Sequence, residues 1–173
     1  MAENPSPIAP ADNDARAMAQ NLLQSARHAA LAYTDPKTGT PGISRIAIGL
    51  DPKGFPITLI SQLSAHHAAL SQNALAAVMV GEPGAKGDPL THPRLMIHVK
   101  ALFLDRADPN AEAIRALWLR DHPKSKLYID FADFGFVRLS PLSAFLNGGF
   151  GRAVTLAPAD LLPQAELSQR TVT

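Results

Sequence analysis

The sequence predicts a mainly β protein, a barrel or sandwich with accessory helices. Its 173 residues include 15 prolines and 11 glycines, a content that indicates many short and rather stiff loops. Several short runs of β-forming residues alternate with these turn signals, as they do in all-β domains. The early strands are joined by turns too short for parallel crossovers, so antiparallel pairing is expected.

The chain is expected to begin with a tail and then form one domain. Residues 1–12 are rich in Pro, Ala, Asn and Asp and are predicted to be a flexible N-terminal tail. Residues 13–173 show no linker and no internal repeat, which favours a single domain. The first element of this domain is a helix from Asp14 to about His28, and its apolar face is formed by Met18, Leu22, Leu23 and Ala26.

Two hairpins are expected after this helix. The strand Ala29–Thr34 ends at a turn, Asp35–Gly39. A second turn, Asp51–Gly54, joins the strand Pro41–Leu50 to the strand Phe55–Ser61. The further predicted strands are Leu75–Val80, Arg94–Asp105, Gly135–Leu139 and Ser143–Leu146. The further predicted helices are Ser64–Gln72, Pro109–His122 and Ala159–Gln169.

The composition excludes several classes of function. The formal net charge of +1 gives no electrostatic support for binding nucleic acid or a membrane surface. The absence of cysteine excludes disulfides, thiol catalysis and thiolate metal sites. No apolar run is long enough to cross a bilayer, and the N-terminus lacks the basic and apolar regions of a secretory signal, so we expect a cytoplasmic protein.

The stretch between the third strand and the short helix suits an anion. Ser61, Ser64 and His66 lie around the start of the helix Ser64–Gln72. The first turn of a helix offers unpaired N–H groups and the positive end of the dipole, so these side chains could hold a phosphorylated ligand. An ordinary N-cap on a surface helix explains the same residues.

Two strand faces could line a ligand pocket. In the second strand, Arg45 shares a face with small residues, while Ile46 and Ile48 point to the other side. In the strand from Arg94, the residue His98 shares a face with Arg94, Met96 and Lys100, and the core face is formed by Leu95, Ile97, Val99, Ala101 and Phe103. Basic groups on these faces could meet an anionic ligand. Solvated strand faces are the alternative interpretation in both cases.

Motifs for catalysis by the protein alone are missing from the sequence. No metal-ligand spacing, serine-hydrolase elbow, dinucleotide fingerprint or phosphate loop is present. No metal site and no catalytic residue is therefore predicted, with His98 as a possible acid or base. Any redox chemistry would need a cofactor.

Four segments together resemble a known family. They are ARHAALAYTDPKTGTPGISRIAIGLD, SQLSAHHAALSQNALAAVMVG, DPLTHPRLMIHVKA and FLNGGFGRA, which span residues from about Asp14 to Leu156. In their order and spacing the chain resembles the FMN-binding split-barrel superfamily typified by pyridoxamine 5′-phosphate oxidase. It resembles more closely the branch that includes haem-utilisation flavoproteins. The resemblance implies a six-stranded antiparallel split barrel of Greek-key type that forms a homodimer with FMN at the interface.

The resemblance also implies a set of cofactor-binding residues. Val154 and Leu156 stand where the oxidases have a histidine and an arginine, which argues against oxidation of pyridoxamine phosphate itself. His66 stands in place of a lysine, and Ala65 in place of an arginine, so the charge on the phosphate would depend on pH. The implied cofactor-binding residues are Ser44, Arg45, Ser61, Gln62, Ser64, His66 and Arg94, with Asn147 and Arg152 contributed across the interface.

The sequence thus leads to one leading hypothesis and two alternatives. The first is an FMN-dependent oxidoreductase that acts on an unknown small molecule. The second is a haem- or tetrapyrrole-binding protein of the haem-utilisation type without turnover. The third is a dimeric scaffold with a vestigial flavin cleft.

Overall fold

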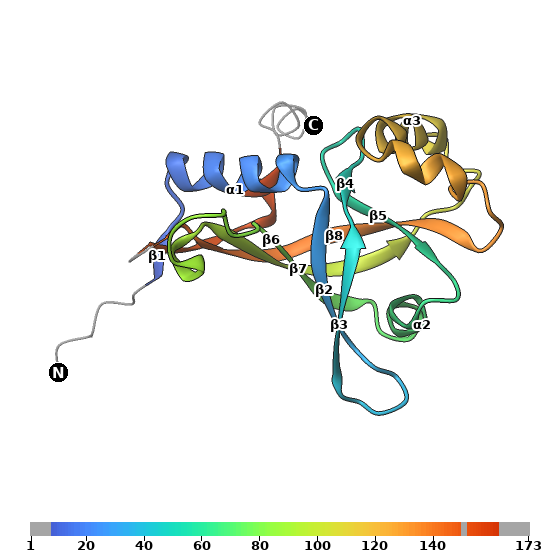
Figure 1. The fold of residues 1–173 in the computed structure, drawn as a ribbon, viewed down its shortest axis with the longest axis horizontal. Coiled ribbons are helices and arrows are strands. Elements are labelled where there is room, and N and C mark those ends of the chain that lie inside the picture. Colours follow the sequence, from blue (N-terminus) through green and yellow to red (C-terminus); the bar gives the residue numbers. More distant parts are fainter. Residues whose placement is uncertain (1–7, 150–151, 163–173) are drawn as a thin grey trace, which may run out of the picture.

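Nine strand segments form one curled sheet in the computed structural model, which describes residues 8–149 and 152–162 (Figure 1). Their order is β1-β9-β8-β7-β6-β2-β3, and β5 joins the sheet through β8 and pairs also with β4. The strands are β1 Ile8–Pro10, β2 His28–Thr34, β3 Pro41–Ala47, β4 Gly49–Leu50, β5 Pro56–Ser61, β6 Leu75–Val80, β7 Arg94–Phe103, β8 Phe134–Asn147 and β9 Ala153–Leu156. The α-helices of the described residues are α1 Asn13–Ser25, α2 Ala65–Gln72 and α3 Ala111–Asp121.

The prediction of a mainly β, antiparallel fold with accessory helices is confirmed. The parallel pair of β1 and β9 is the exception to antiparallel pairing among the described strands. The sheet curls into a half-barrel, and in Figure 1 helices α1 and α3 lie above the strands while α2 lies below β5. The predicted count of six strands is wrong, because short strands at β1, β4 and β9 extend the sheet. The Greek-key connection stays a prediction.

The predicted strand Pro41–Leu50 is divided at Ile48. β3 pairs with β2, whereas only Gly49–Leu50 pairs with β5. Ile48 is 1% exposed, and its N–H donates to the carbonyl of Arg27 instead of a strand partner. At the next residue a Cβ on Gly49 would lie 3.3 Å from the Trp118 ring. The chain therefore breaks its ladder where helix α3 packs against it.

The two predicted strands near the C-terminus are one strand, β8, with a bulge. His98 of β7 pairs with Ser143, and the next residue, Val99, pairs with Pro141. Leu142 is therefore an extra residue on β8, and it is 48% exposed. The bulge shifts the buried positions from odd to even numbers, which in the sequence looks like the end of one strand and the start of another.

The ends of the chain also differ from the prediction. Residues 8–10, predicted as flexible tail, form β1, and the Asp12 carboxylate caps α1 by accepting from the N–H of Ala15 at 2.7 Å. Helix α1 ends at Ser25, so His28 begins β2. The start of the predicted helix over residues 159–169 is a 3-10 turn at Pro158–Leu161, and residues 163–169 lie outside the described residues.

Two apolar clusters hold the sheet and helices together. The larger lies between α1 and the sheet, where Ala15 and Ala19 let the helix approach closely. The four predicted core residues of β7 from Leu95 to Ala101 are buried there, but Phe103 is 38% exposed. The smaller cluster joins α3 to β5 and consists of Ile57, Leu59, Ile114, Trp118 and Ile129. No helix of the described residues is long and apolar enough to span a membrane.

Candidate functional site

The predicted site residues lie in three places in one chain. Four of them surround the turn from β5 to α2, and Ser44 and Arg45 lie on β3. The others lie where β7 begins and β8 ends. Each place has its own geometry.

At the β5–α2 turn, both serine hydroxyls are engaged within the protein. Ser64 is the N-cap of α2: its hydroxyl accepts from the N–H of His67 at 3.3 Å and donates to the carbonyl of Ser61 at 2.7 Å. Ser61 donates to a carboxylate oxygen of Asp133 at 2.5 Å. These hydroxyl groups are therefore not available to donate to a phosphate, which would also be repelled by the negative charge of Asp133. The cap explanation therefore accounts for Ser64, and Gln62 is exposed beside it.

His66 does not supply the expected charge at this turn. Its side chain is half-buried, and burial together with the neighbouring His67 lowers the pKa of its imidazole. Because an ordinary histidine titrates near 6.5, a lowered pKa leaves His66 neutral at pH 7. The expected contact between His66 and a phosphate stays a prediction.

Tyr33 joins this turn and was not among the predicted site residues. Its ring centroid lies 6.4 Å from that of His66, and its hydroxyl accepts a hydrogen bond from Ser44 at 3.3 Å. Across the hairpin, a Cβ on Gly42 would lie 2.6 Å from the Tyr33 ring. Tyr33 and Gly42 lie opposite each other in the two strands of the predicted hairpin. This cross-strand pair is the sequence signal that could have identified Tyr33 as part of the site.

Ser44 and Arg45 point to opposite faces of the sheet. Ser44 pairs with the buried Leu31, and Arg45 pairs with Ala30. Because consecutive residues of a strand alternate, only Ser44 lies on the side of Tyr33. Arg45 is exposed on the other side.

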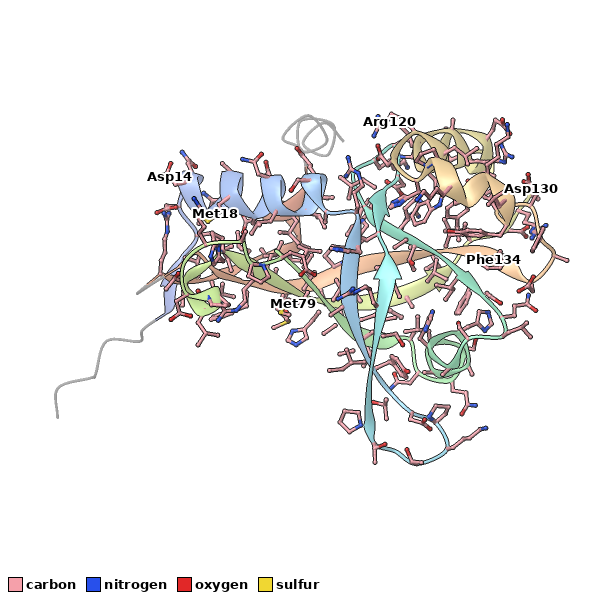
Figure 2. All side chains as sticks on the ribbon, viewed as in Figure 1. Asp14, Met18, Met79, Arg120, Asp130 and Phe134 are labelled. Atoms are coloured by element: carbon pink, nitrogen blue, oxygen red, sulfur yellow. The ribbon has the colours of Figure 1, made fainter. Side chains whose placement is uncertain are left out.

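That other side is an open face of the sheet, turned away from α1. Strand pairing places Arg45, Ala30, Met79, Met96 and Phe145 in one row across β3, β2, β6, β7 and β8. Figure 2 labels Met79 on the side of the strands opposite to Met18 of α1. We use the name open face for the side chains of Arg45, Met79, Met96, His98 and Phe145.

The open face is apolar at its centre and polar at its edges. Met79 is 45% exposed, and Ile43, which lies on the same face at the edge strand, is 76% exposed. His98 is also exposed, and its Nδ1 lies 3.1 Å from the hydroxyl of Ser143. Apolar side chains gathered on one exposed face are typical of a surface that binds a ligand or another protein.

The third group lies at the far end of β8. Arg94 pairs with Asn147, and its guanidinium donates to the carbonyl of Leu90 at 3.0 Å. The side-chain oxygen of Asn147 accepts from the N–H of Gly149. Arg152 forms an ion pair with Asp12 at 2.9 Å. Residues 150 and 151 of the predicted segment lie outside the described residues.

One chain does not unite the predicted cofactor residues. Ser61 pairs with Phe134 at the start of β8, and Arg94 pairs with Asn147 at its end. The strand has 14 residues, so at about 3.3 Å per residue its ends lie roughly 40 Å apart along the strand. A single ligand of flavin size cannot reach both ends.

β9 contributes no polar group at its two inward positions. Val154 and Leu156 are 3% and 1% exposed and belong to the larger core cluster. They stand where the resemblance places a histidine and an arginine in the oxidases. Their burial agrees with the sequence argument against oxidation of pyridoxamine phosphate.

The chain is similar to proteins whose names refer to haem. No family model matches it. It is 30% identical over 128 residues to the "Non-canonical heme oxygenase HOZ, chloroplastic" of Arabidopsis thaliana; the match covers 68% of this chain and 37% of that relative. The chain therefore spans little more than a third of the curated relative's length.

Solved structures share the fold. The protein Atu2129 of Agrobacterium tumefaciens is 32% identical, with a TM-score of 0.78 and coverage of 94% of this chain and 67% of that chain. A heme binding protein from Mycobacterium smegmatis is 24% identical, with a TM-score of 0.77 and coverage of 92% and 61%. At 15% identity, a Clostridium acetobutylicum protein of the pyridoxinephosphate oxidase family has the same fold, with a TM-score of 0.65 and coverage of 87% and 99%. The chain therefore has the split-barrel fold of the pyridoxinephosphate oxidase family protein and of the heme binding protein, and its sequence is similar to that of a protein named a heme oxygenase.

Proposed function

We propose that this protein binds haem or a related tetrapyrrole against its open face. The observation that carries the proposal is the composition of that face, where two thioethers and Phe145 lie beside His98. Arg45 lies in the same row as Met79, and Arg94 lies on the same face two residues before Met96. The face thus combines an apolar centre with an imidazole and two guanidinium groups.

These groups match the chemistry of haem. The macrocycle is flat and apolar, so Met79, Met96 and Phe145 would bury it. The two propionates are carboxylates, which Arg45 and Arg94 would bind. The Nδ1 atom of His98 is engaged with Ser143, so Nε2 is the atom that would hold the iron.

The relatives support the same class of ligand. The Arabidopsis relative is named a heme oxygenase, and the Mycobacterium smegmatis protein is named a heme binding protein. We extend the proposal to oxidative turnover of haem, since the enzyme relative matches over 68% of this chain. When bound, the haem supplies the oxygen chemistry, and the protein would position it and exclude water.

We further propose that two copies pair through the open face. Exposed Ile43 and Met79 would be buried, which removes apolar surface from water. Pairing would also bring the β5–α2 turn of one chain toward Asn147 and Arg152 of the other. Within one chain, these two places are separated by roughly 40 Å along β8. Each tetrapyrrole would then lie between the two open faces, and the partner chain would cover its outer side.

FMN is the second candidate, favoured by one feature of the β5–α2 turn. The backbone N–H groups of Ala65 and His66 have no partner among the hydrogen bonds of the described residues. They could bind a phosphate together with exposed Gln62. The serine and histidine side chains do not fit a phosphate in their present contacts, so we derive no chemistry through a flavin.

Absorption spectroscopy separates the two candidates. Haemin added to the purified protein should produce a Soret band that saturates at one equivalent per chain, and the band should shift in His98→Ala. His67→Ala is the matched control, because His67 lies on α2 and packs against Phe103, which points to the face of β7 opposite to His98. A signal that never saturates, or equal loss in both variants, would defeat the haem proposal. A bound flavin band would favour FMN.

A further inference from the structure

A cavity of about 230 Å³ lies between the start of α3 and the start of β8. Its floor is apolar and is formed by Leu59, Ile114, Ile129 and Phe136, and Phe134 adds an aromatic wall. Figure 2 labels Asp130 and Phe134 in this region, next to α3. None of the predicted cofactor residues lines it. Apolar cavities with a few converging polar groups are the usual form of a small-molecule site.

Hydrogen bonds hold the mouth of the cavity in place. Arg106 donates to the carbonyls of Phe131 and Phe134, the second at 2.8 Å. Arg115 of α3 forms two hydrogen bonds with the Asp130 carboxylate, at 3.2 and 2.8 Å. Three separate stretches of the chain are thus joined around the opening. A preformed cavity binds a ligand without first having to order its walls.

The rim of the cavity carries an excess of negative charge. Four carboxylates line it, from Asp105, Asp108, Glu112 and Asp130, against the two guanidinium groups. Both guanidinium groups already have partners, whereas Glu112 makes no hydrogen bond or close ion pair with the described residues. The hydrogen bonds from Arg115 lower the pKa of Asp130, and those from Asn110 lower the pKa of Asp108, so both stay ionised.

We infer that this cavity binds a small organic cation, an ammonium group attached to an aromatic or aliphatic body. The body lies on the apolar floor, where it is removed from water. The ammonium group faces the carboxylates of the rim and the face of Phe134, which attracts cations. An anion of the same shape would meet the carboxylates and be repelled.

The chain offers a direct signal for binding. Trp118 is its single tryptophan, and it packs in the cluster that forms the floor of the cavity. Its ring centroid lies 5.5 Å from that of Phe136, which lines the cavity. A ligand on the floor therefore changes the surroundings of Trp118 through one layer of side chains.

Three probes with one body test the charge. Tryptophan fluorescence is titrated with phenethylammonium, 2-phenylethanol and phenylacetate, on protein without added cofactor. Phenethylammonium should saturate at about 1–5 mM, the range for a ligand of this size. The alcohol should bind about fivefold more weakly and the carboxylate at least about tenfold. Equal affinity of the three probes, or no saturation by the ammonium probe, would overturn the inference.

Paired variants locate the site. Ala111→Leu places a side chain in the cavity, and Ala113→Leu is its control, because Ala113 is exposed on the same helix turn and does not line the cavity. Ala111→Leu should lose binding while Ala113→Leu keeps it. Glu112→Gln should weaken the ammonium probe about fivefold and leave the alcohol unchanged, with Glu82→Gln as its control. If Ala111→Leu does not fold, the Glu112 pair decides: an unchanged affinity in Glu112→Gln would refute the inference.

Discussion

Loss of Asp51 should strongly destabilise the protein. The Asp51 side chain is completely buried, and its carboxylate forms an ion pair with Arg138 at 2.8 Å. It also accepts from the backbone N–H groups of Lys53 and Phe55 at 2.8 and 3.0 Å. These bonds fix the turn between β4 and β5 onto β8. Asp51→Ala leaves two N–H groups and a guanidinium group without their acceptor.

The magnitude follows from what is left unpaired. Breaking a buried ion pair by removing one partner costs about 3–5 kcal/mol. Arg138 is 20% exposed, so part of its charge can be solvated, and we expect about 3 kcal/mol. Urea unfolding followed by far-UV circular dichroism gives this value, and the melting temperature should fall by about 6–12 °C.

A double variant separates the contribution of the Asp51–Arg138 ion pair from that of the hydrogen bonds within the turn. Arg138→Met alone leaves Asp51 buried with only its two backbone donors, so it should cost about as much as Asp51→Ala. The loss of stability measured for the double variant should be smaller than the sum of the losses of the two single variants. The difference, which is the coupling energy, should be at least about 1 kcal/mol. A loss below about 1 kcal/mol for Asp51→Ala, or no coupling, would refute the reasoning.

Three further predictions concern other parts of the molecule. Because the pKa of His66 is lower in the folded state than its ordinary value of 6.5, the unfolded chain binds more protons as the pH falls. Stability should therefore decrease from pH 7 to pH 5 more steeply in the wild type than in His66→Gln, and equal slopes in urea titrations would contradict this. Gly81→Ala should cost about 2 kcal/mol or more, because Gly81 has a φ of +103° and a Cβ there would lie 2.5 Å from the carbonyl of Pro93; an unchanged melting curve would show that the loop adapts. Met79→Glu places a charge at the centre of the open face and should convert a dimer to a monomer in light scattering, while Lys37→Glu on an exposed turn should not.

The sequence predicted the parts of the fold that depend on local pattern. The alternation from Leu95 to Ala101 identified the buried face of β7, and the turn at Asp35–Gly39 identified the hairpin of β2 and β3. The bulge in β8 was not predicted, because a one-residue shift in the alternation of apolar residues looks the same as two short strands. The strand β9 and its parallel partner β1 were not predicted, because the paired residues lie more than 140 positions apart in the sequence, at 8–10 and 153–155.

The candidate site was predicted by residue type more successfully than by role. Serine at the start of α2 indicated a polar turn, but the partner of Ser61 is Asp133, 72 residues away, and no local pattern signals it. The neutral state of His66 depends on its burial, which the sequence did not reveal. The split of Ser44 from Arg45 followed from strand alternation and could have been predicted.

Titration with haemin decides whether the open face binds a tetrapyrrole. A Soret band should saturate at one haem per chain, and the affinity should be about tenfold or more weaker in His98→Ala than in His67→Ala. The haem-loaded protein, given a reductant and oxygen, should lose the Soret band faster than haem alone. No uptake of haem in the presence of excess haemin, or equal affinity in the two variants, would contradict haem binding at the open face.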